Sequence, residues 1–85
     1  MLKRNDEYIC RKVNNTFYII DDKNLYRINE VMARILSLCC GDENSNSEFI
    51  TAKLSEYYNM NKNDIKDDVI HAIKQLINEK IIFEV

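Results

Sequence analysis

The apolar residues of this chain change their spacing once, at about Asn29, and this change limits the folds open to it. Before Asn29 they occur in short runs rich in β-branched and aromatic residues, which favour strands. After Asn29 they recur at spacings of three and four residues, the period of an amphipathic helix. Strands followed by helices, rather than alternating with them, are typical of an α+β fold.

Three short runs before Asn29 predict strands, at residues 8–13, 16–20 and 25–28. The first two are joined by Asn14 and Asn15, which tolerate the positive φ angles of a two-residue hairpin turn. The polar residues 21–24 predict a second tight turn. We therefore expect an antiparallel three-stranded meander in which residues 25–28 form an edge strand.

The first helix is predicted to begin after Asn29, whose side chain can cap it, and to run to about Cys40. Gly41 is the only glycine in the chain. It follows where a helix commonly ends in a left-handed residue, so we expect it to terminate this helix.

Two further helices are predicted downstream. Ser45 and Glu48 have the spacing of a capping box, which predicts a second helix from Glu48 to Tyr58. Asn63 can cap a third helix that runs to about Lys80.

The apolar residues 81–85 predict a short strand or a clamp against the core. Together the elements predict one domain over residues 1–85, a three-stranded antiparallel sheet followed by three helices. This is the general content of a winged-helix-like domain.

Size and charge exclude several function classes. A chain of 85 residues builds a thin core, which argues against a self-sufficient enzyme with a deep pocket. The net charge of −2 argues against a dedicated binder of DNA or anionic membranes. No apolar stretch approaches the length of a membrane span, and the charged first ten residues do not resemble a secretory signal, so we expect a cytoplasmic protein.

The chain offers no recognisable catalytic, metal or cofactor site. A single glycine excludes a glycine-rich phosphate loop. His71, the only histidine, is predicted to lie on the surface of the third helix. The acidic residues near the start of that helix suit its dipole better than a cation. Three cysteines without C-x-x-C spacing predict neither a disulfide framework nor a zinc site.

The third helix has a wider apolar face than packing on one layer requires. Its core stripe consists of Ile65, Val69, Ile73 and Leu76, and Ile70 and Ile77 lie about a quarter turn away, on the side of Lys66 and Lys74. Two interpretations stay open. Ile70 and Ile77 contact the sheet or the first helix, or they line a groove flanked by lysines that accepts an apolar segment with acidic residues.

The predicted edge strand, Leu25-Tyr26-Arg27-Ile28 with Asn24 before it, has backbone groups that could pair with another extended chain. It contains no proline, and Arg27 is its only charge. Either this edge is simply too short to aggregate, or it binds a peptide. In the second case the edge and the flank of the third helix would form one peptide site.

Several segments resemble the PqqD family in order and spacing. They are Leu25-Tyr-Arg-Ile-Asn-Glu30, Ile35-Leu36, Cys40-Gly41, Asp67-Asp-Val69, Ile73, Leu76 and Ile81-Ile82. The resemblance runs from about Tyr8 to Val85. Two positions depart from the family pattern: Cys40 stands where an acidic residue is usual, and Lys80 where glycine is frequent.

The resemblance implies a recognition element for ribosomally made, post-translationally modified peptides. Such domains bind the leader region of a precursor peptide and present the rest to a modifying enzyme, such as a radical S-adenosylmethionine (radical SAM) maturase, a cyclodehydratase or a leader peptidase. In this chain the leader would pair with residues 24–28. The groove side chains would be Lys66, Ile70, Ile73, Lys74 and Ile77.

Two other functions stay open. The winged-helix content also suits a DNA-binding regulator, although the second and third helices each carry a small acidic excess. The edge strand and the polar loop at residues 42–46 would also permit a structural module that exchanges strands between protomers. We therefore expect a monomer or a strand-exchanged dimer, with no cofactor.

Overall fold

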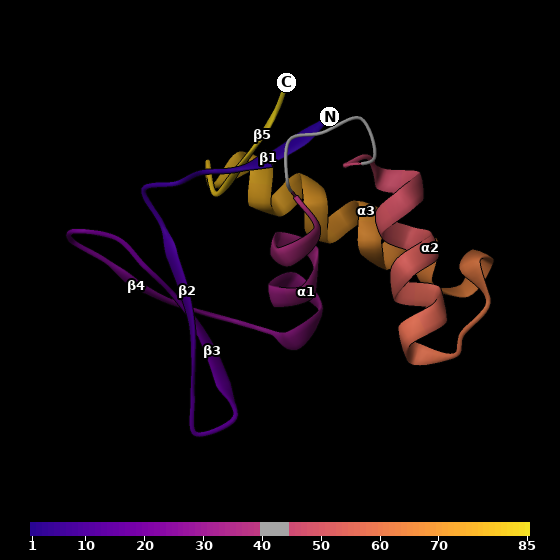
Figure 1. Cartoon of the computed structure of the whole chain (residues 1–85), viewed down its shortest axis with the longest axis horizontal. Helices are drawn as coiled ribbons and strands as arrows, with labels where there is room; N and C mark the ends of the chain where they lie inside the picture. The colour runs from indigo at the N-terminus through magenta and orange to yellow at the C-terminus, as the bar shows by residue number, and fades with distance from the viewer. Residues whose placement is uncertain (40–44) are drawn as a thin grey trace.

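The computed structural model describes residues 1–39 and 45–85. All the strands but one precede the helices (Figure 1). The element order is β1 (Leu2–Arg4), β2 (Ile9–Val13), β3 (Thr16–Ile20), β4 (Leu25–Ile28), α1 (Glu30–Leu38), α2 (Ser47–Tyr58), α3 (Lys62–Asn78) and β5 (Ile82–Glu84). The α+β class predicted from the sequence is confirmed. The predicted roles of Cys40 and Gly41 lie outside the described residues.

Strands β2, β3 and β4 form the predicted antiparallel meander. Asn14 and Asn15 have φ angles of 49° and 66°, so the two-residue turn uses the left-handed conformation that Asn tolerates. At the second turn the Asp21 carboxylate accepts hydrogen bonds from the backbone N–H groups of Lys23 (2.8 Å) and Asn24 (2.5 Å). Both turns therefore form for the local reasons that their residues suggest.

The predicted cap of α1 is confirmed, because the Asn29 side chain accepts a hydrogen bond from the Met32 N–H at 2.8 Å. The caps predicted for α2 and α3 are wrong by one or two residues. Asn46 caps α2 and Asn61 caps α3. Ser45 is instead buried, and its carbonyl accepts a hydrogen bond from the Leu2 N–H of β1 at 2.5 Å.

A second sheet joins the two ends of the chain. β1 pairs with β5 in antiparallel register, Lys3 opposite Phe83. The sequence predicted a short strand or clamp near residues 81–85, but β1 was not predicted, because a three-residue strand with Leu2 as its only apolar residue carries no period.

Lys80 links α3 to β5 in the left-handed region, with φ 61°. Its N–H donates to the Ile77 carbonyl, and the next N–H, of Ile81, donates to the Leu76 carbonyl. This is a Schellman motif, in which glycine is the usual residue. The position where the family pattern often has glycine is thus one where the backbone favours it.

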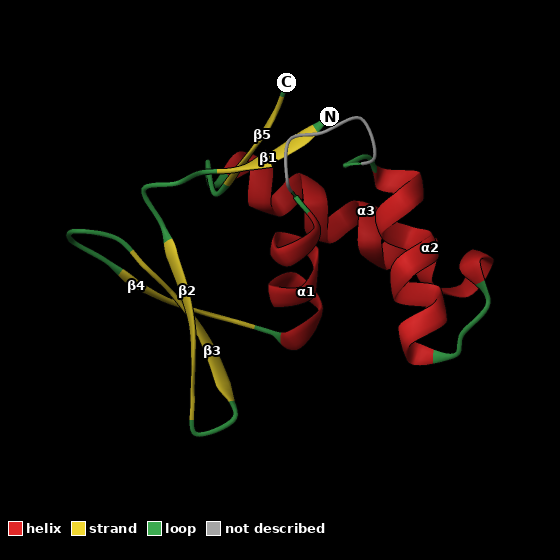
Figure 2. Cartoon of the chain, viewed as in Figure 1, coloured by secondary structure: helices red, strands yellow, loops and turns green. Residues whose placement is uncertain are grey.

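The helices and the β1–β5 sheet enclose the hydrophobic core, and the meander lies to one side of it (Figure 2). Ile19, with 1% of its surface exposed, is the one meander residue among the buried core residues. Tyr8 and Ile28 pack against the core while partly buried. β2 is exposed along its whole length. The meander is therefore attached to the rest of the molecule through one face of β3 and part of β4.

Candidate functional site

β4 is an edge strand, as predicted, and half of its backbone groups point away from β3. The Asp21 N–H donates to the Asn24 carbonyl at 3.0 Å, which makes these two residues a hydrogen-bonded pair. Such pairs alternate along an antiparallel ladder. Given the register of β3 and β4, Tyr26 and Ile28 bond to β3, whereas Leu25 and Arg27 direct their N–H and C=O groups to the open edge.

A pocket separates this edge from the C-terminal half of α3. It has a volume of about 170 Å³. Its lining consists of three β4 residues with Met32, Ile81 and one flank of α3, namely Tyr26, Arg27, Ile28, Met32, Gln75, Leu76, Glu79 and Ile81. We call it the β4–α3 pocket. Its floor is apolar and its rim carries Arg27 on one side and Glu79 on the other, so it suits an amphipathic extended segment.

The side chains of β4 point alternately into and away from this pocket. Tyr26 and Ile28 share the face of the sheet that carries Ile19, which turns toward the core. Leu25 lies on the opposite face and is 64% exposed. Asn24 lies in the turn before the strand.

The α3 residues predicted to share this site lie elsewhere. Ile70, Ile73, Lys74 and Ile77 line a groove beside β1, β5 and the start of α2, which we call the β1–β5 groove. Lys66 lines a neighbouring pocket between α2 and α3, together with Ile70. Ile73 belongs to the core and is 5% exposed. The structure therefore does not bring these five residues together with β4.

The reason is the direction from which the meander approaches α3. Successive helical residues differ by about 100°, so the buried stripe of α3 through Val69 and Leu76 has two flanks. Gln75 and Glu79 lie on one flank, and Ile70 and Ile77 on the other. The meander packs beside the first flank. In the sequence, Gln75 and Glu79 look like any solvated pair, so no local feature identifies them.

The Asn24 end of β4 is acidic. A hollow at this end is lined by Glu7, Asp21, Asp22, Lys23 and Asn24. Partial burial and then the nearby carboxylates, Asp21 foremost and Glu79 among them, raise the pKa of the Tyr8 hydroxyl. Three carboxylates against one lysine therefore line the hollow. We call this region the acidic end.

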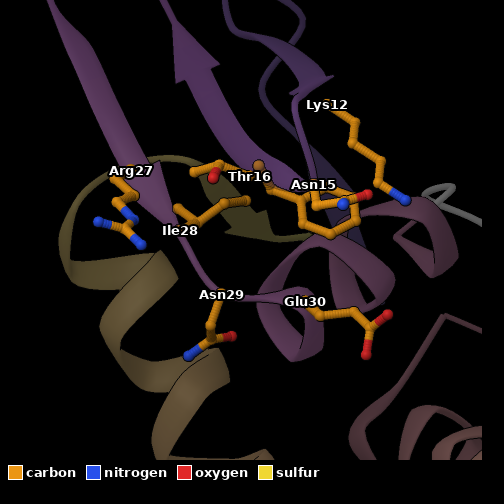
Figure 3. Close-up of a pocket in the computed structure, with 8 residues that line it drawn as sticks. Lys12, Asn15, Thr16, Arg27, Ile28, Asn29 and Glu30 are labelled. Atoms are coloured by element: carbon orange, nitrogen blue, oxygen red, sulfur yellow. The ribbon is translucent and has the colours of Figure 1, made fainter.

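At the Ile28 end of β4 lies a hollow whose lining includes Lys12 from β2 and Arg27 from β4 (Figure 3). The hollow there is lined by Lys12, Asn15, Thr16, Phe17, Arg27, Ile28, Asn29 and Glu30. The Lys12 ammonium group lies 5.5 Å from the centre of the Phe17 ring, which places it on the inner face of the sheet. We call this region the basic end.

The one carboxylate at the basic end is already engaged. Glu30 accepts a hydrogen bond from Arg34 at 3.3 Å and another from the Tyr58 hydroxyl at 3.0 Å. The Arg34 guanidinium group also stacks on the Tyr57 ring, 3.4 Å from its centre. Within residues 1–39 and 45–85, the ion pair between Arg34 and Glu30 is the only one, so Lys12 and Arg27 have no carboxylate partner there.

The described residues contain no group of three or more His, Cys, Asp or Glu side chains placed to hold a metal ion. In the same part of the chain, no helix has the length and apolar character needed to cross a membrane. His71 is exposed, as predicted.

Comparisons with known proteins agree with this fold. The chain has the fold of the solved structure "TbiB1 in Complex with the TbiA(beta) Leader Peptide". The two are 16% identical and superpose with a TM-score of 0.74 over 98% of this chain and 96% of that chain. No match was found among curated protein sequences.

A family model that matches most of the chain confirms the resemblance that the separate motifs suggested. The family model described as coenzyme PQQ synthesis protein D (PqqD) matches residues 17–82, from β3 to the start of β5. This range contains β4, the three helices and every residue of the β4–α3 pocket. The chain therefore belongs to the PqqD family.

Proposed function

We propose that this chain is a non-catalytic adaptor that captures the leader region of a ribosomally made precursor peptide. The leader adds to β4 as a further strand and its side chains enter the β4–α3 pocket. The observation that carries this proposal is the open backbone edge of β4 directly beside an apolar pocket. Membership of the PqqD family and the likeness to TbiB1, which was solved with a leader peptide, support it.

Strand addition uses groups that β4 leaves unpaired. An antiparallel peptide would exchange hydrogen bonds with Leu25 and Arg27, in continuity with the antiparallel meander. Every second peptide side chain would then face the pocket, between Tyr26 and Ile28 on one side and Gln75 and Glu79 on the other. A peptide of about ten to fifteen residues bound in this way can reach micromolar affinity.

The proposed peptide site keeps residues 24–28 and replaces the groove side chains expected from the sequence. Gln75, Glu79 and Met32 take the place of Lys66, Ile70, Lys74 and Ile77, which line other surfaces. Ile73 supports α3 from the core.

The chemistry would reside on a partner enzyme that receives the presented precursor. The partner would be a radical SAM maturase, a cyclodehydratase or a leader peptidase, and a leader held along β4 would present the rest of the precursor to it. Because precursor peptides are made on ribosomes, we place this encounter in the cytoplasm.

The test compares the peptide affinity of a variant blocked at the β4 edge of the meander with that of a variant blocked at the β2 edge. Binders are selected from a displayed library of random 15-residue peptides, and their affinities are measured by fluorescence anisotropy. Leu25→Pro removes an N–H that points to the open edge of β4 and leaves the β3–β4 ladder intact. We expect it to weaken binding at least tenfold, because the lost hydrogen bond and the ring both obstruct strand addition.

Cys10→Pro is the matched control on the opposite edge. Val13 and Thr16 flank the two-residue turn as a bonded pair, so alternation directs the Cys10 N–H away from β3. We expect this variant to bind the selected peptides normally. Equal affinities of the two variants, or a library that yields no binder, would contradict strand addition to β4. Tight retardation of duplex DNA at low salt would instead favour the winged-helix regulator.

A further inference from the structure

The two ends of β4 differ in charge, and a bound peptide would contact both. We propose that this groove selects peptides by the order of their charges: an acidic residue at the Ile28 end and a basic residue at the Asn24 end. This inference rests on the proposed strand addition and specifies which leader sequences the chain accepts.

The basic end attracts anions because its own carboxylate is occupied. Glu30 is held by Arg34 and by the Tyr58 hydroxyl, at 3.3 and 3.0 Å. Lys12 and Arg27 reach the hollow from β2 and β4, on either side of the Ile28 side chain (Figure 3). Arg27 lies on the edge strand itself, whereas Lys12 lies on β2 at the far edge of the sheet. A peptide carboxylate beside Ile28 would therefore meet the Arg27 guanidinium group directly and Lys12 only as a more distant positive charge, and neither cation has an ion-pair partner among the described residues.

The acidic end has the opposite imbalance. Three carboxylates line its hollow, and Lys23 is the only cation among the lining residues. The Asp21 carboxylate is also held in its charged form, because hydrogen bonds from the N–H groups of Lys23 and Asn24 lower its pKa.

The distance between these two ends predicts how far apart the acidic and basic residues of the peptide should lie. Asn24 lines the acidic hollow and Ile28, four residues further along, lines the basic hollow. An extended chain advances about 3.3 Å per residue, so the ends are about four to six peptide residues apart. An antiparallel peptide enters at Ile28 and leaves at Asn24. The preferred segment therefore has Asp or Glu first, Lys or Arg about four to six positions later, and alternating apolar residues between them.

This rule differs from the expectation drawn from the sequence, in which Lys66 and Lys74 received acidic residues. Those lysines lie on surfaces away from β4. The charge order comes instead from residues of the meander, which face the peptide from the sheet side.

The experiment uses the same 15-residue library and reads the sequences of the binders that Leu25→Pro disrupts. We expect these peptides to be enriched for an acidic residue about four to six positions before a basic one. Arg27→Glu should weaken such a peptide about three- to tenfold at low salt, and Asp22→Lys should do the same from the other end. Both losses should shrink as salt is raised.

Two controls test whether the loss of affinity depends on the position of the changed charge and on the order of the peptide charges. Lys74→Glu makes the same charge reversal in the β1–β5 groove and should change affinity less than about twofold. A peptide with its two charges exchanged should bind the wild type more weakly and the double variant Arg27→Glu/Asp22→Lys more tightly.

The outcomes distinguish the two proposals. Binders that depend on Leu25 but show no charge order, or the reverse order, would overturn the selection rule and leave strand addition standing. Failure to recover any binder that depends on Leu25 would overturn strand addition itself.

Discussion

The meander and the helical part of this molecule are built in opposite ways. The helices and the β1–β5 sheet share a core in which Ile35, Ile50 and Ile82 are fully buried. The meander contributes Ile19 to that core and exposes all of β2 and most of β4. Figure 1 shows the consequence, because the β2–β3–β4 meander projects from the helices. Stability resides in one region, and the unpaired backbone edge in the other.

This division explains how a small domain keeps an exposed edge. Strand edges invite aggregation when they are long, flat and apolar. β4 has only four residues and carries Arg27, and the turn before it is charged. The helical region supplies the folding energy, so the meander can present backbone groups that a core strand would have to pair.

The largest expected effect tests where the stability lies. Leu54→Ala removes a side chain that is 2% exposed between the helices, and we expect it to lower the free energy of unfolding by about 2 to 5 kcal/mol. Val13→Ala, at the 51% exposed end of β2, is the matched truncation in the meander and should cost less than about 0.5 kcal/mol. Urea denaturation measures both. Equal losses would refute the division.

A smaller effect of opposite sign is expected at the end of α3. Lys80→Gly relieves a left-handed backbone at φ 61° and should raise the free energy of unfolding by about 0.5 to 1 kcal/mol. Asn59→Gly, at φ 53° after α2, should gain less, because Asn tolerates this conformation. Thermal unfolding checks the pair, and a loss of stability in Lys80→Gly would contradict the strain at this position.

The smallest effect concerns the turn before β4. Hydrogen bonds from Lys23 and Asn24 lower the pKa of Asp21 below its unfolded value. A carboxylate with a lowered pKa stabilises the folded state above the unfolded pKa of about 3.9, and this contribution is lost as the pH falls through the folded pKa. We expect the amide resonances of Lys23 and Asn24 to shift below about pH 4 while those of the α2 core stay unchanged. Simultaneous changes in both would indicate global unfolding instead.

Much of the fold could be predicted because its causes are local. The three meander strands, the Asn14-Asn15 turn and the Asn29 cap each follow from residues within a few positions of one another. The Ser45 cap failed because a distant strand, β1, bonds to the Ser45 carbonyl and the residue is drawn into the core. β1 itself carries no periodic pattern.

The peptide site shows the same contrast between local causes and contacts of distant segments. The sequence by itself determined that residues 25–28 form an exposed edge and that α3 has a buried stripe with two flanks, because strand propensity and helical period are properties of the chain. Only the tertiary structure decided that the meander lies beside Gln75 and Glu79 rather than Ile70 and Ile77. The period of a helix defines its faces, but which neighbour packs on each flank depends on contacts between segments far apart in the sequence.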